Sequence, residues 1–148
     1  MLVISDPTDG HGFEQEFCGC DFTGMGRQLR HRAHNFEEGV RRVKARQYLF
    51  DNWDPRKPRT PLSQCLYRRV ASRLKRGEEL RLFIAINTVL DFRMGIDCFF
   101  EYDHRIATID LTVSTFKKYF RAHFLLRRLD FLRNEHYRIG DLIAQKLS

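Results

Sequence analysis

Apolar residues recur at three- and four-residue steps in three parts of the chain, and this spacing predicts three helices. The first stretch runs from His34 to Trp53, the second covers residues 62–76, and the third covers residues 136–148. Three prolines within residues 54–61 separate the first two stretches, because proline cannot continue a helix.

Three further stretches have the composition of β-strands. Residues 80–90 form a short, largely apolar run of the kind that a buried strand shows, and residues 123–126 are β-compatible. Residues 95–114 consist of two β-rich runs joined by a tight turn at Asp103-His104. Together these patterns predict an α/β fold with a mixed central β-sheet flanked by helices.

The first thirty residues show little periodicity and contain five of the nine glycines. We therefore expect an irregular N-terminal arm over residues 1–30. Residues 31–148 then form a single α/β domain, since 148 residues leave little room for a second one.

The tight turn fixes which residues of the two β-rich runs face each other. If residues 103 and 104 form a two-residue turn, Tyr102 pairs with Arg105, and the same pairing places Asp97 opposite Asp110. Side chains alternate between the faces of a strand, so one face is mostly apolar and should lie on the core, while both aspartates share the other face. Directly opposed residues have Cβ atoms roughly 4.5–5.5 Å apart.

Two carboxylates this close repel, so either the pKa of one rises or a cation joins them. A divalent ion held by two carboxylates, a backbone carbonyl and water suits Mg²⁺ or Mn²⁺. Alternatively, Asp97 is a turn or capping residue after Gly95, and Asp110 pairs with an arginine. A register slip of one residue would put the two acids on opposite faces.

The segment TVLDFRMGIDCFFEYDHRIATIDLTVS, residues 88–114, resembles the nuclease core of the PD-(D/E)XK superfamily. It is also similar to uncharacterised bacterial and phage proteins with the pattern G-(I/V)-D-x-F-F-E-Y followed by T-I-D-L-T. The resemblance is clearest over residues 88–118, about a fifth of the chain. It implies a restriction-endonuclease-like core and Mg²⁺- or Mn²⁺-dependent hydrolysis of phosphodiester bonds in DNA or RNA.

In that superfamily two acids lie on successive strands, and Asp97 and Asp110 match them, so the resemblance implies that these two hold the metal ion. A lysine normally follows the second acid by two residues, but here that position is Thr112. Lys117 or Lys118 would then have to reach the site from the following segment to assist hydrolysis. If neither does, the fold would be kept without cleavage activity.

Many members also carry a helical glutamate before the first strand. The helix expected over residues 62–76 has none, which leaves Glu37 and Glu38 on the earlier helix as candidate substitutes. Asp91 is either a supporting acid behind the metal ligands or a loop cap, and we favour the cap.

The charge balance points to a polyanionic partner. Lys and Arg total 26 against 19 Asp and Glu, giving a net charge of +7, and 20 of the 26 are arginine. Nucleic acid is the commonest partner of such a chain. The second helix and the residues directly after it present a basic face for a phosphate backbone: Arg68, Arg69, Arg73, Lys75 and Arg76. For a single run, a solvated helix face is the simpler interpretation.

Two other functions fit the same pattern: a module that binds nucleic acid without cleaving it, or a protein-interaction module. The chain contains no segment of membrane-spanning length, and its N-terminus does not have the pattern of a signal peptide, so we expect a cytoplasmic protein. A homodimer is a further expectation, because small nucleases of this kind often dimerise.

Overall fold

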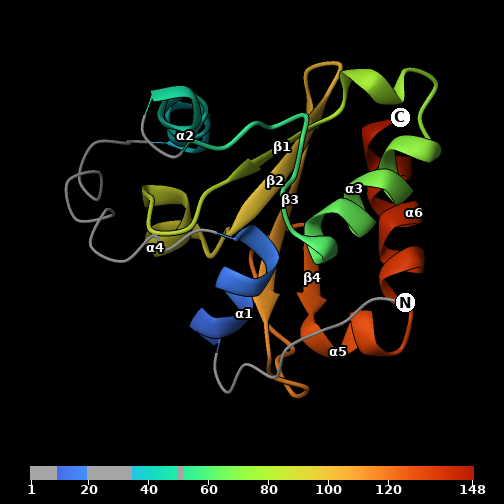
Figure 1. The fold of residues 1–148 in the computed structure, drawn as a ribbon. Helices are drawn as coiled ribbons and strands as arrows, with labels where there is room; N and C mark the ends of the chain where they lie inside the picture. Colours follow the sequence, from blue (N-terminus) through green and yellow to red (C-terminus); the bar gives the residue numbers. More distant parts are fainter. Residues whose placement is uncertain (1–9, 20–34, 50–51) are drawn as a thin grey trace.

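The computed structural model describes residues 10–19, 35–49 and 52–148, and these residues form a mixed four-stranded sheet with helices on both faces (Figure 1). The strands lie in the order β1 (Arg81–Ile84), β2 (Cys98–Tyr102), β3 (Arg105–Thr112), β4 (Phe124–Arg127). The pairs β1–β2 and β2–β3 are antiparallel, and β4 runs parallel to β3. The expected α/β fold with a mixed central sheet is confirmed.

Helices cover both faces of the sheet (Figure 1). Their bounds are α1 (Gly10–Cys18), α2 (Phe36–Leu49), α3 (Pro61–Ser72), α4 (Val89–Met94), α5 (Arg128–Leu132) and α6 (His136–Leu147), with a short 3-10 helix η2 (Gly77–Glu79). The larger apolar core lies between the sheet and α1, α3 and α6. A smaller one lies on the opposite face, under α2 and α4.

The hairpin has the predicted turn and register. Asp103 and His104 have φ values of 49° and 65°, which match a two-residue hairpin turn with two left-handed residues. Tyr102 pairs with Arg105, and the register continues to Cys98 opposite Ile109. The expected apolar face, which includes Cys98, lies in the larger core. Because α2 and α4 cover the other face, that face is buried as well.

Four expected boundaries were wrong. The first predicted helix ran to Trp53, but α2 ends at Leu49. Residues 10–18 are not irregular but form α1, because burial of Phe13 and Phe17 in the larger core stabilises a helix despite the flanking glycines. The strand expected over residues 80–90 ends at Ile84, and α4 begins at Val89. The helix expected over residues 62–76 ends four residues early, at Ser72.

Candidate active site

Asp97 lies where the chain enters β2, and every polar group of its backbone is used by the sheet. Its N–H donates to the Ile109 carbonyl (2.9 Å), and its carbonyl accepts from the Ala85 N–H (2.8 Å). Its side-chain Oδ2 accepts a hydrogen bond from the Leu111 N–H (2.7 Å). The carboxylate thus replaces a backbone acceptor at the end of the β2–β3 ladder, and it is held rigidly with only 4% of the residue exposed.

This arrangement corrects the predicted geometry in one respect. The regular ladder begins at Cys98, so Asp97 is not a member of a flat, directly opposed pair with Asp110. On a regular strand Ile96 would share the face of Cys98, but it packs in the smaller core, because the backbone departs from regular alternation at Asp97. Gly95, two residues before Asp97, has a φ of 64°, a conformation that glycine adopts without strain.

Asp110 lies on β3, and Lys117 reaches it from the connection between β3 and β4. The Lys117 Nζ is 2.6 Å from Asp110 Oδ2, and the Asp110 side chain is 8% exposed. The backbone of Lys117 is held in turn, because the guanidinium of Arg127 donates to the Lys117 carbonyl (2.9 Å). Of the two candidate lysines, Lys117 contacts Asp110, whereas Lys118 is exposed beside it.

Two further carboxylates act on Asp97. The pKa of Asp97 lies well above its usual range, because burial disfavours the charged form and because the charges of Asp91 and Glu14 add to that effect. Burial also raises the pKa of Asp91, which accepts a hydrogen bond from the Asn87 N–H and shares one with Asp97. We refer to Glu14, Asp91, Asp97 and Asp110 as the acidic cluster.

Asp91 lies in the first turn of α4 and not in a loop. Its carboxylate caps the residues just before that helix by accepting from the Asn87 N–H, and it contacts Asp97 as well. Some of the same carboxylates act on the buried thiol of Cys98. Burial raises its pKa well above the usual range, and Asp97, Asp110 and Glu14 raise it further. The carboxylates of Glu14, Asp97 and Asp110 thus act together on one buried region at the start of β2.

Glu14 is the member that sequence reasoning missed. It lies on α1, which is fixed by contacts of Phe13 and Phe17 with Phe131, at ring-centroid distances of 6.3 and 6.1 Å. An ion pair of Glu16 with Arg128 (3.2 Å) holds the same helix. The signal was present in the sequence, because Phe13 and Phe17 are one helical turn apart with glutamates between them.

The candidate substitutes Glu37 and Glu38 are not at the site. Glu37 is exposed on α2, and Glu38 pairs with Arg42 on the same helix (3.0 Å). Glu14 is also a helical glutamate that precedes the first strand. Thr112 stands where the superfamily has its lysine, and its hydroxyl accepts a hydrogen bond from the Ser114 N–H (3.1 Å) at the start of the connection that carries Lys117.

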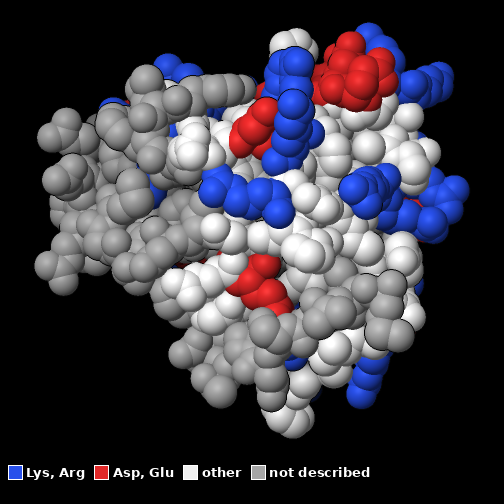
Figure 2. Space-filling view, in the orientation of Figure 1, with Lys and Arg blue, Asp and Glu red and all other residues white. Residues whose placement is uncertain are grey.

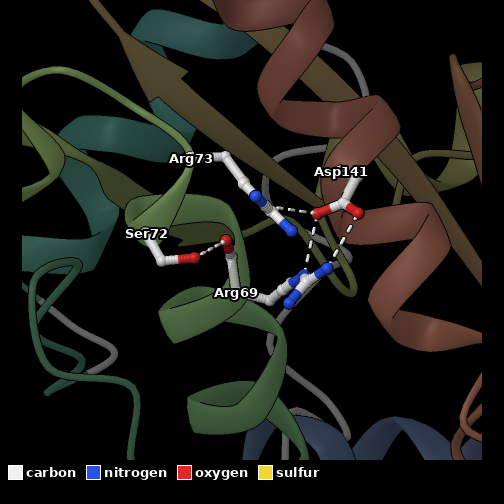
Figure 3. Close-up of polar contacts among 4 residues, drawn as sticks. All are labelled: Arg69, Ser72, Arg73 and Asp141. Atoms are coloured by element: carbon white, nitrogen blue, oxygen red, sulfur yellow. Dashed lines mark hydrogen bonds and ion pairs between the residues drawn. The ribbon is translucent and has the colours of Figure 1, made fainter.

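Three of the five predicted phosphate-binding residues have carboxylate partners within the molecule. Arg69 donates two hydrogen bonds to Asp141 on α6 (2.8 and 2.9 Å), and Arg73 donates a third (3.1 Å; Figure 3). Arg76 lies 3.4 Å from Glu79. The other two, Arg68 and Lys75, are exposed.

On the face seen in Figure 2, Lys and Arg side chains spread over the upper and right-hand parts, with Asp and Glu side chains among them. This mixture of charges is typical of a solvated surface. The assignment of a phosphate-binding face to α3 therefore remains a prediction.

Oxygen ligands such as those of Asp97 and Asp110 suit Mg²⁺ and Mn²⁺. Within residues 10–19, 35–49 and 52–148, no three His, Cys, Asp or Glu side chains converge as a complete metal-binding group. Mg²⁺ does not require one, because it commonly binds to one or two carboxylates together with water and substrate phosphate. The carboxylates of Asp91, Glu14 and Asp110, which together with burial raise the pKa of Asp97, are the observation that fits such an ion.

Comparison of the chain with protein-family models, with curated proteins and with solved structures gave no match. Among the described helices, none combines the length and the apolar character needed to cross a membrane.

Proposed function

We propose that this protein is a metal-dependent nuclease that hydrolyses phosphodiester bonds in DNA or RNA, with Mg²⁺ or Mn²⁺ held by Asp97 and Asp110. The observation that carries the proposal is the position of the Lys117 ammonium, 2.6 Å from Asp110 Oδ2. It supplies, from a different position in the chain, the cation that the resemblance expects at Thr112. The helical Glu14 supports the proposal, because its charge acts on Asp97.

Each side chain has its own part in the proposed reaction. A bound divalent ion would lower the pKa of a coordinated water and neutralise charge that develops on the phosphate. Asp97, held by the Leu111 N–H, presents a carboxylate that cannot turn away. Lys117 would orient the attacking water or stabilise the phosphate oxygens in the transition state. Glu14 and Asp91 add the negative charge that favours a cation over an empty site.

A non-cleaving nucleic-acid-binding or protein-interaction module is the second candidate. The observation that favours it is that Lys117 already occupies Asp110 while no third side-chain ligand stands ready among the described residues. Such a module would keep the fold and the net positive charge but would not turn over a substrate.

A cleavage assay separates the candidates. The protein is incubated with plasmid DNA and with RNA in Mg²⁺, in Mn²⁺ and in EDTA. We expect metal-dependent cleavage that EDTA abolishes and that is lost in Asp97→Asn and in Asp110→Asn. These variants keep the side-chain shape, so circular dichroism should show a retained fold. Lys57→Met, which removes an exposed lysine from the turn before α3, is the control and should cleave normally.

Each remaining outcome assigns a different function. Salt-sensitive retention of nucleic acid without cleavage in either metal would support the binding module. No retention at moderate salt would support the protein-interaction module. Cleavage that survives both asparagine variants would show that the acidic cluster is not the active site.

A further inference from the structure

The connection between β3 and β4, residues 113–123, exposes aromatic side chains beside the candidate active site. Phe116 is 86% exposed, Tyr119 is 91% exposed and Phe120 is 41% exposed. Isolated exposed apolar residues are common, but three aromatic side chains within five residues form a patch that needs an explanation. Lysines 117 and 118 lie in sequence between Phe116 and Tyr119, and Arg121 follows.

The backbone of this connection is held at both ends. Near its start, the Phe116 N–H donates to the Ser114 hydroxyl (3.2 Å). Near its end, the guanidinium of Arg121 donates to the Arg93 carbonyl on α4 (2.6 Å). His123 exchanges two hydrogen bonds with Thr108 on β3, at 2.8 and 3.0 Å. The aromatic rings are therefore displayed from a fixed segment, so little conformational entropy is lost when something stacks on them.

Cationic side chains lie beside this connection. A cavity of about 370 Å³ adjoins the connection, and it is lined by the cationic side chains of Lys117, Lys118, Arg127 and Arg138, with Phe120 and His123 among the other residues. Asp130 is the acidic residue in that lining, and it accepts a hydrogen bond from the backbone N–H of Arg127 (2.7 Å). The cations therefore outnumber the acid, and the segment suits an anionic ligand.

We propose that residues 116–121 bind single-stranded nucleic acid. Phe116 and Tyr119 would stack on unpaired bases, and the neighbouring lysines and arginines would contact the phosphates. Aromatic stacking requires an accessible base face, which duplex bases do not offer because they stack on one another. The charge complementarity argues for nucleic acid over an apolar protein partner. Cleavage of the bound strand rests on the proposed function, since Lys117 lies within this segment and contacts Asp110.

The test measures binding in EDTA, where no cleavage occurs. Fluorescence anisotropy follows a short labelled single-stranded DNA, the same sequence as RNA, and the corresponding DNA duplex. We expect tighter binding of a single strand than of the duplex, and the two single-stranded probes distinguish DNA from RNA. The double variant Phe116→Leu with Tyr119→Leu should weaken single-strand binding about 10- to 100-fold, because stacking on each aromatic ring contributes substantially.

Matched variants keep the test specific. Phe116→Trp with Tyr119→Trp retains the aromatic faces and should bind at least as tightly as the wild type. Leu132→Ala shortens another exposed apolar side chain, on α5, and should bind normally. The inference is overturned if the leucine variant binds single strands as tightly as the wild type. It is equally overturned if that variant loses duplex binding to the same extent, or if its only change is in self-association.

Failure of this inference differs from failure of the proposed function. A protein that cleaves in Mg²⁺ but binds independently of the aromatic rings would remain a nuclease without this single-strand binding site. A protein that binds single strands through the rings but never cleaves would support the single-strand binding site and contradict the proposed activity.

Discussion

Two parts of the molecule concentrate charge, and they do so in opposite ways. Between α3 and α6, Asp141 receives hydrogen bonds from two arginines, and the bond from Arg69 is the main cause that lowers its pKa. In the acidic cluster, Asp97 is buried with other carboxylates, and its pKa is raised. The first arrangement is balanced and stabilises the packing of two helices. The second brings buried carboxylates together, an arrangement that is common at functional sites.

The packing around the two regions supports this distinction. Gly140 lets α6 approach α3 closely, because a Cβ at that position would lie 2.9 Å from the Arg69 side chain. The Arg69–Asp141 pair closes that contact from the outside (Figure 3). The acidic cluster instead sits at the beginning of β2, where the carboxylate of Asp97 interrupts a regular ladder. The first contact joins two helices, whereas the second places carboxylates together at the start of a strand.

The largest effect is expected for Lys117→Met, which removes the one cation that contacts Asp110 among the described residues. We expect kcat for cleavage to fall about 100- to 1000-fold, because a charge that acts in the transition state is lost. Steady-state kinetics on a single-stranded substrate would measure kcat and KM separately. A fall in kcat of less than about tenfold, well below that range, would contradict the assignment.

A second variant sharpens this prediction. Residue 112 lies two positions after Asp110 on β3, so its side chain points to the same face. A lysine there could reach the acids from the strand itself. Thr112→Lys in the Lys117→Met background should therefore recover part of the lost activity, while Thr112→Arg, whose charge is held in a larger planar group, should recover less.

The next largest effect is stabilisation by the metal ion. If the acidic cluster binds Mg²⁺ in the folded state alone, a free concentration about a hundred times the dissociation constant adds about 2.7 kcal/mol to the free energy of unfolding. Chemical denaturation with Mg²⁺ and with EDTA would measure it. The same increment in Asp97→Asn would place the ion elsewhere.

A smaller effect is expected for Asp97→Asn without metal. This substitution should raise the free energy of unfolding, whereas most substitutions lower it. The folded-state pKa of Asp97 is raised, so the folded protein loses stability as the pH rises from the unfolded value toward the folded one. Asparagine mimics the protonated acid and still accepts from the Leu111 N–H. We expect a gain of about 0.5–2 kcal/mol at pH 7, shrinking toward pH 4, in urea denaturation curves.

Asp141→Asn is the counterpart in the balanced region and should be destabilising. Its pKa is lowered by Arg69 and Arg73, so its contribution is present at neutral pH and is lost as the pH falls through the folded-state value. The variant should melt at a lower temperature at pH 7, and the difference from wild type should disappear in acid. Stabilisation by Asp141→Asn would remove the contrast between the two regions.

The sequence predicted the parts of the site that depend on local pattern. The hairpin register followed from a two-residue turn, which placed Asp97 and Asp110 near each other. Lys117 could be offered only as one of two candidates, because the path of the connection after β3 is set by tertiary contacts such as that of Arg127. Glu14 escaped prediction, since α1 is stabilised by packing of Phe13 and Phe17 on α5 rather than by local propensity.

The smallest expected change in stability concerns His123, which holds the connection between β3 and β4 to β3 by hydrogen bonds with Thr108. Its Nδ1 accepts a hydrogen bond from the Thr108 N–H, so the imidazole must be neutral at that nitrogen. Burial lowers the pKa of His123, and the charge of Lys146 lowers it further. For a lowered histidine pKa, stability is fully present above the unfolded value near 6.5 and is lost as the pH falls below it.

His123→Asn keeps a side-chain acceptor but cannot titrate. We therefore expect its free energy of unfolding to vary less between pH 7 and pH 5 than that of the wild type. His104→Asn, at an exposed turn position whose positive φ asparagine accepts readily, is the matched control and should keep the wild-type pH dependence. If both variants behave alike, the connection is not held by the neutral imidazole. The rings of Phe116 and Tyr119 would then be displayed from a less rigid segment than the hydrogen bonds indicate.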